Sequence, residues 1–202
     1  MISVPTGSGK SMVFSLLPFC LGKCVMVVTP LLSLMADQVD KIDSNFNDLT
    51  ATSLGPDMDS NAVRARVENG EVKIVLVTPE SYVANLAAWS VDKPFFNKYF
   101  GAIVFDEGHD YVLIDRDFRP DFLTLSKSQF RATKLVILSG SLTSRVERAM
   151  IDSVFSHLPE IKEAFDNKIF ESQDRDNLFM AIAGRNSRTD FRPFQWIIKV
   201  SE

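Results

Sequence analysis

The residues best suited to do chemistry lie at the start of the chain, in the segment Pro5-Thr6-Gly7-Ser8-Gly9-Lys10-Ser11. Glycine at positions 7 and 9 lets the backbone turn tightly, so that successive N–H groups converge on phosphate oxygens. Lys10 would place its ammonium group on the β- and γ-phosphates, and Ser11 would offer a hydroxyl to Mg²⁺ at the start of a helix. The spacing therefore predicts a loop that binds a nucleoside triphosphate with Mg²⁺. The alternative is a Gly/Ser turn that precedes a helix and binds nothing.

A second group with chemical potential is a pair of adjacent carboxylates. The apolar stretch Ala102–Phe105 ends directly in Asp106 and Glu107. Next to a phosphate-binding loop, Asp106 would hold Mg²⁺ and Glu107 would polarise the water that attacks the γ-phosphate. The alternative is a polar strand end that faces solvent.

The elements that must position these residues follow from the alternation of apolar runs with helical patterns. Continuous apolar runs are typical of parallel strands buried on both faces. We expect strands at Cys24–Val28, Ala51–Leu54, Ile74–Val77, Ala102–Phe105 and Leu135–Leu138. We expect helices around residues 31–42 and at Ser60–Asn69, Pro79–Ala88, Asp121–Lys127 and Ser144–Phe155. The pattern predicts an α/β fold, a mostly parallel sheet with helices on both faces.

Polar or turn-forming residues follow the strands at Thr29-Pro30, Thr78-Pro79-Glu80, Asp106-Glu107 and Ser139-Gly140-Ser141. Because the carboxyl ends of parallel strands meet at one edge of a sheet, these residues should form a single site. His109 would then bridge the nucleotide site to the hydroxyls of Ser139 and Ser141. Taken alone, His109 could equally be a surface imidazole.

Composition limits the possible partners. The chain has 202 residues, 46% of them hydrophobic, and a net charge of −4, so no global positive field recruits nucleic acid and any contact must come from a local patch. Cys20 and Cys24 have no further ligands nearby, so we expect buried thiols and no zinc. The apolar run Met12–Leu21 is too short to span a membrane and is interrupted by Pro18. We expect an intracellular protein with no membrane partner.

Several segments, in order along the chain, resemble the motifs of the first motor domain of RecQ-family helicases, which belong to superfamily 2. The segments that resemble motifs I, Ia, Ib, II and III are Val4–Ser11, Thr29–Val39, Val77–Glu80, Asp106–His109 and Leu138–Thr143. The variant of motif I with valine at position 4 is normal for helicase-type motors. Arg116–Phe122 resembles the end of the aromatic-rich loop peculiar to RecQ enzymes, and Asp176-Asn177-Leu178 resembles the start of the second motor domain.

The resemblance implies a RecA-like P-loop NTPase domain that takes part in ATP-driven 3′→5′ DNA unwinding. Residues 1–167 would form the ATP-binding domain, and residues 168–202 would begin the interdomain linker and second motor domain and end in a divergent tail. Phe118 and Arg119 would bind single-stranded DNA and couple it to ATP hydrolysis. The alternative is a turn in which Phe118 and Phe122 pack under the sheet. In a eukaryote, the nucleus would be the expected compartment.

The chain also departs from the family pattern. Leu113 and Ile114 lie where the family carries a Gln-Trp pair, and Gly108 lies where it carries alanine. Because few residues precede the loop, and because no second motor domain follows, we expect a truncated first motor domain that does not unwind DNA alone. The other reading is a degenerate, non-enzymatic fragment that binds nucleotide or DNA.

Overall fold

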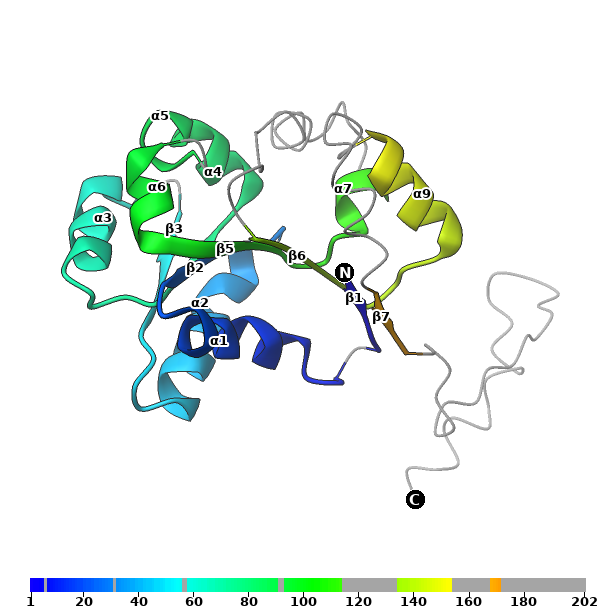
Figure 1. The fold of residues 1–202 in the computed structure, drawn as a ribbon, viewed down its shortest axis with the longest axis horizontal. Coiled ribbons are helices and arrows are strands. Elements are labelled where there is room, and N and C mark those ends of the chain that lie inside the picture. Colours follow the sequence, from blue (N-terminus) through cyan, green and yellow to red (C-terminus); the bar gives the residue numbers. More distant parts are fainter. Residues whose placement is uncertain are drawn as a thin grey trace, which may run out of the picture.

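The protein is described by a computed structural model, which defines residues 1–5, 7–30, 32–55, 58–90, 93–113, 134–153 and 168–171. Within these residues, a parallel sheet of seven strands has the order β3-β4-β2-β5-β6-β1-β7 (Figure 1). The strands are β1 Ile2–Ser3, β2 Cys24–Val28, β3 Ala51–Leu54, β4 Ile74–Val77, β5 Phe100–Phe105, β6 Lys134–Ser139 and β7 Ile169–Phe170. The expected α/β fold with a parallel sheet is confirmed.

The central strands are buried on both faces, as their continuous apolar runs predict. Every residue of β2 and of β4 is buried. Alternate residues of each strand face two separate cores, because successive side chains of a strand point to opposite sides. Val25 and Val27 belong to one core, whereas Met26 and Val28 belong to the other.

The two cores are covered by different helices. Helices α1 (Lys10–Leu21) and α2 (Leu32–Asn45) cover one face, where Phe14, Met35 and Ile42 are buried. The opposite face is covered by α3 Ser60–Glu68, α4 Pro79–Ala84, α5 Leu86–Trp89, α6 Pro94–Tyr99, α7 Asp110–Leu113 and α9 Ser144–Ser153. Figure 1 shows α1 and α2 below the sheet and the other helices above it. Helices therefore lie on both faces, as expected.

The helix expected at residues 79–88 is two helices. The hydroxyl of Thr78 accepts a hydrogen bond from the Ser81 N–H at 3.2 Å, and Pro79 occupies the first turn, so α4 begins as a capped helix should. The chain leaves helical geometry at Asn85 (φ −106°, ψ 11°) and starts α5 at the next residue.

Some short elements, among them α6, α7 and β7, have no counterpart among the expected helices and strands. Helix α6 begins at Pro94 and buries Phe95 and Phe96. Strand β7 pairs with β1 at the sheet edge, with Ile169 beside Ile2, and its own side chains are exposed. Residues 168–171 thus join the same sheet. The expected boundary between the ATP-binding domain (residues 1–167) and the segment 168–202 stays a prediction.

Only one of the two cysteines is buried as expected. Cys24 is buried and its thiol lies 3.0 Å from the Val72 carbonyl oxygen, but Cys20 is exposed in the last turn of α1, so the expectation of two buried thiols was wrong for Cys20. Burial raises the pKa of the Cys24 thiol. Among the helices that the structure describes, none is both long and apolar enough to cross a membrane.

Candidate functional site

The loop between β1 and α1 has the backbone form that phosphate binding needs. Gly7 (φ +88°) and Gly9 (φ +82°) both have left-handed geometry, which side chains other than glycine rarely adopt. The Ser8 N–H donates to the Pro5 carbonyl oxygen at 3.2 Å, and the Met12 N–H donates to the Gly9 carbonyl oxygen at 2.9 Å as α1 begins. Because Gly9 has no side chain to cap α1, the first N–H groups of the helix remain available to an anion.

The acidic turn, Asp106–His109, follows β5 at the same edge of the sheet. The Asp106 N–H donates to the Val28 carbonyl oxygen at 2.9 Å, and the Gly108 N–H donates to the Leu138 carbonyl oxygen at 2.8 Å. The turn is therefore fastened to β2 on one side and to β6 on the other. Glu107 has a φ of +46°, and such a conformation costs about 1–3 kcal/mol outside glycine. Strain of this kind gathers at functional sites.

Gly108 allows the acidic turn to lie close to β6. A Cβ atom at this position would come within 2.5 Å of Ile137 Cγ2 and 3.1 Å of Met150 Cε. Glycine at position 108 is therefore needed for space and not for a left-handed backbone, since its φ is not positive. Gly108 is thus part of a close contact between two chain segments.

Asp106 is a buried carboxylate, with 7% of its surface exposed. Burial raises the pKa of Asp106, and the negative charge of Glu107 adds to the increase. Hydrogen bonds from the Glu107 N–H and the Gln38 side chain, together with the charge of Lys10, act in the opposite direction. A carboxylate held in this way is suited to a cation, since a bound cation would remove the cost of burying its charge.

Lys10 connects the loop to the acidic turn. Its Nζ lies 4.0 Å from Glu107 Oε1, and only 9% of the Lys10 side chain is exposed, against 31% for Glu107. The structure therefore brings together the three predicted catalytic residues, Lys10, Asp106 and Glu107. The segments that carry them follow strands that are not neighbours, β1 and β5, since β6 lies between the two.

The residues predicted to couple the site to β6 are in contact. His109 Nδ1 lies 3.0 Å from Ser139 Oγ and 3.4 Å from Glu107 Oε2. The Gly140 N–H donates to Glu107 Oε2 at 3.4 Å, and the Ser141 N–H donates to Ser139 Oγ at 3.3 Å. Ser139 is fully buried, so its hydroxyl is fixed between the imidazole and the turn that follows β6. Ser141 takes part through its backbone N–H.

The donor set fits Mg²⁺ bound together with a nucleotide. Mg²⁺ usually takes one or two carboxylates, keeps several waters and completes its shell with substrate phosphates. Asp106 supplies a buried carboxylate, and Ser11 supplies a hydroxyl in the first turn of α1. Within the part of the chain that the structure describes, no three His, Cys, Asp or Glu side chains gather into a metal cluster. A divalent ion bound by these two groups would also draw on phosphate oxygens of the nucleotide.

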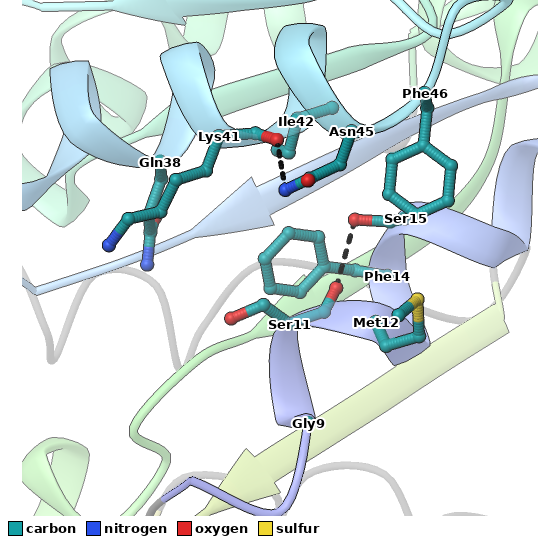
Figure 2. A pocket seen from close by; sticks show the side chains of 10 residues that line it. All are labelled: Gly9, Ser11, Met12, Phe14, Ser15, Gln38, Lys41, Ile42, Asn45 and Phe46. Carbon is teal, nitrogen blue, oxygen red and sulfur yellow. Dashed lines mark hydrogen bonds between the residues drawn. The ribbon is translucent and has the colours of Figure 1, made fainter.

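Gln38 is a site residue that the sequence did not reveal. It lines a pocket of about 480 Å³ between α1 and α2 (Figure 2). Figure 2 shows Ser11 and Gln38 reaching into this pocket from the two helices. The Gln38 side chain is among the groups that act to lower the pKa of Asp106, against the effect of burial. Its signal in the sequence was a polar residue inside the apolar stripe of α2.

A second pocket of about 430 Å³ lies where β2 and β4 end. It is lined by Pro30, Leu32, Thr78, Glu80, Ser81, Ala84 and Asn85. None of these residues is basic, so the pocket by itself offers no cation to a nucleic-acid phosphate. Thr6 and the predicted DNA-binding residues Phe118 and Arg119 lie outside the described residues.

A glycine-bearing loop before a helix, an acidic turn two strands away and a histidine linked to the intervening strand define a P-loop nucleotide-binding domain of the helicase type. The family model for DEAD/DEAH box helicases matches residues 1–149. The chain therefore belongs to the DEAD/DEAH box helicase family.

Its curated relatives include RecQ-type DNA helicases. The chain is 29% identical to the RecQ-like DNA helicase BLM of Xenopus laevis, covering 98% of this chain and 14% of the relative. It is 30% identical to the ATP-dependent DNA helicase Q-like 2 of Arabidopsis thaliana (93% and 26% covered). It is 27% identical to the ATP-dependent DNA helicase RecQ of Haemophilus influenzae (88% and 28% covered). The chain is thus homologous to RecQ helicase motor domains and spans less than a third of each of these relatives.

Solved structures support the fold. The helicase domain of Hef from Pyrococcus furiosus has a TM-score of 0.61 at 17% identity, over 86% of this chain and 35% of that one. A hypothetical ATP-dependent RNA helicase from Sulfolobus tokodaii has a TM-score of 0.53 at 20% identity, over 76% and 44%. The RecA-like architecture agrees with these neighbours.

Proposed function

We propose that this chain is the ATP-binding motor domain of a RecQ-like 3′→5′ DNA helicase, which couples ATP hydrolysis to DNA binding and unwinding in the whole enzyme. The observation that carries the proposal is the convergence of Lys10, Asp106 and Glu107 at one sheet edge, with Lys10 Nζ 4.0 Å from Glu107 Oε1. The names of the curated relatives support DNA as the substrate.

In this proposal, the loop binds the triphosphate through its backbone N–H groups and Lys10. Lys10 leaves Glu107 when phosphates arrive, because phosphate oxygens offer it a stronger charge partner. Ser11 and Asp106 would hold Mg²⁺, which neutralises charge on the phosphates when bound. Glu107, released from Lys10, orients and polarises the attacking water.

His109, Ser139 and Ser141 would couple this chemistry to the rest of the domain. Support comes from the contact of His109 Nδ1 with both Ser139 Oγ and Glu107 Oε2. A movement of Glu107 on nucleotide binding would therefore be felt by the turn that follows β6. Helix α9 begins just beyond that turn, at Ser144.

DNA would be bound in part by Phe118 and Arg119. An exposed aromatic ring can stack on a base, and a guanidinium can contact a phosphate. The net charge of −4 supports a local contact over a general attraction. If the source organism is eukaryotic, we place the protein in the nucleus, where a fluorescent fusion would be expected to accumulate.

The test is release of phosphate from ATP, with and without single-stranded DNA. We expect Mg²⁺-dependent hydrolysis that Lys10→Ala abolishes and that Lys134→Ala leaves unchanged. Lys134 is a matched control because it lies at the opposite end of β6 and is exposed. Equal hydrolysis in wild type and Lys10→Ala would contradict the proposed site. Nucleotide binding without any hydrolysis would favour the non-enzymatic alternative.

A further inference from the structure

Helix α9 carries two arginines that have no acidic partner. Arg145 and Arg148 are both exposed and lie three residues apart, so their side chains are neighbours on one face of the helix. Among the residues that the structure describes, neither arginine makes an ion pair with a carboxylate. Glu147, which lies between them in the sequence, pairs instead with Lys168. Helix α9 therefore presents two unpaired positive charges to solvent.

The other arginines in the described part of the chain have partners within the protein. On α3, Arg64 Nε lies 3.2 Å from Glu68 Oε1. On the same helix, Arg66 donates a hydrogen bond to Thr52 Oγ1 at 3.2 Å. These two arginines are thus explained by contacts of the folded chain, whereas the arginines of α9 have no such explanation.

The position of Arg145 is also unfavourable for the helix itself. It lies in the first turn of α9, where the partial positive charge of the helix N-terminus disfavours a cation. The last turn, where a cation would stabilise the helix, has no basic residue. Asp152, four residues after Arg148, forms no ion pair with it in the structure as described. The arrangement therefore favours a role in binding an anion over a role in helix stability.

A third group that can contact phosphate lies on the same surface. Ser144 is exposed and lies four residues before Arg148, on the same face of α9. We call the surface formed by Ser144, Arg145 and Arg148 the α9 patch. Ser144 follows Ser141 by three residues, and the Ser141 N–H donates to Ser139 Oγ at 3.3 Å. Figure 1 shows α9 beside α7, the helix that follows the acidic turn. The α9 patch is therefore joined to the candidate site by one short turn.

We propose that the α9 patch binds the phosphate backbone of single-stranded DNA. The inference rests on the proposed function, since it takes DNA as the partner of this domain. Arginine and serine side chains commonly donate to phosphate oxygens, and such contacts are independent of sequence. A chain with a net charge of −4 needs local cations for this contact, and the α9 patch supplies two. Because the Gly140 N–H before α9 donates to Glu107 Oε2 at 3.4 Å, DNA bound here would act next to the residue proposed to polarise water.

The test is the affinity for a fluorescein-labelled oligothymidine, measured by fluorescence anisotropy over a series of salt concentrations. Arg145→Gln/Arg148→Gln removes both charges and keeps polar side chains. Each phosphate contact on a single strand adds about 0.7 to the steepness with which log affinity falls against log salt concentration, so this slope should decrease by about 1.4. At about 0.1 M salt, the same two contacts correspond to about 25-fold weaker binding.

Arg64→Gln/Arg66→Gln is the matched control, because it removes the same charge from α3, where both arginines have partners in the protein. It should keep the wild-type slope. Arg145→Lys/Arg148→Lys keeps the charge of the α9 patch and should also keep the slope. Lys134→Gln, at the exposed start of β6, serves as the control if the α3 variant does not fold. Thermal unfolding checks that each variant is folded.

The outcomes separate this inference from the proposed function. If wild type binds the oligothymidine and a folded Arg145→Gln/Arg148→Gln variant binds it with the same slope, the inference is overturned and the proposed function stands. If the α3 control loses as much affinity as the α9 variant, DNA responds only to net charge and the inference is again overturned. If wild type binds no single-stranded DNA, both the inference and the proposed coupling to DNA fail, whereas ATP hydrolysis still tests the nucleotide site by itself.

Discussion

Replacing Gly108 by alanine would add a methyl group where the acidic turn lies against β6. The new Cβ would be 2.5 Å from Ile137 Cγ2, whereas carbon atoms in favourable contact lie about 3.5–4.0 Å apart. One of the two segments must therefore move by about 1 Å. Ile137 is buried and β-branched, so its side chain has little freedom to rotate away. The more flexible Met150, at 3.1 Å, can adjust more easily.

The expected cost follows from these contacts. Overpacking of a buried site costs about 1–3 kcal/mol, while replacing glycine by alanine returns about 0.4–1 kcal/mol through the unfolded state. We expect Gly108→Ala to lower the free energy of unfolding by about 1–2 kcal/mol. For a domain of this size, the melting temperature should fall by about 2–8 °C. An alanine at this position would thus destabilise this chain.

Thermal and urea unfolding of Gly108→Ala measure this effect. Gly55→Ala is the control, because a Cβ there would meet nothing closer than Leu32 Cδ1 at 3.9 Å, and it should change stability by less than about 0.5 kcal/mol. Ile137→Leu removes the Cγ2 branch, so Gly108→Ala should cost less in that background. If Gly108→Ala is as stable as wild type, the close contact between the turn and β6 is wrong.

Three further variants test single contacts. Glu107→Gln should keep nucleotide binding but lose most ATP hydrolysis, as phosphate release would show. Burial in the folded state raises the pKa of Asp106 above its ordinary value of 3.8. The wild-type protein therefore loses stability as pH rises through the raised pKa, because Asp106 must then ionise while buried. Asp106→Asn should raise the melting temperature at neutral pH and leave it unchanged below pH 3.8. Asp59→Ala removes the cap of α3, where Asp59 Oδ1 accepts from the Asn61 N–H at 2.9 Å, and should cost about 1 kcal/mol in urea unfolding.

The buried strands could be predicted because each is a continuous apolar run with turn-forming residues at its end. The observed bounds Cys24–Val28, Ala51–Leu54 and Ile74–Val77 are the predicted ones. Strand β7 could not be predicted, since its two exposed residues carry no pattern and owe their geometry to pairing with β1. Helix α6 depends on contacts outside its own residues, such as Phe95 with Trp89 at 5.2 Å between ring centroids and with the Arg64 guanidinium, 4.2 Å from the ring centroid.

The part of the candidate site that lies at the carboxyl ends of the strands could be predicted from the sequence. Lys10 and Glu107 had to share an edge once the sheet was parallel, and the structure places them there. The place of Gln38 in the pocket between α1 and α2 depends on the rotation and placement of α2 over the sheet, which periodicity alone does not fix. The space needed at Gly108 depends on how closely the turn approaches Ile137, a tertiary distance with no sequence signal.

The most direct test of the account is a calorimetric titration of Mg·ATP into the wild-type chain and into Lys10→Ala. In the proposed site, the triphosphate lies on the loop that Lys10 closes, beside Asp106 and Glu107. It predicts saturable binding to wild type and no measurable binding to a folded Lys10→Ala variant. Equal binding to both proteins, or none to folded wild type, would contradict it.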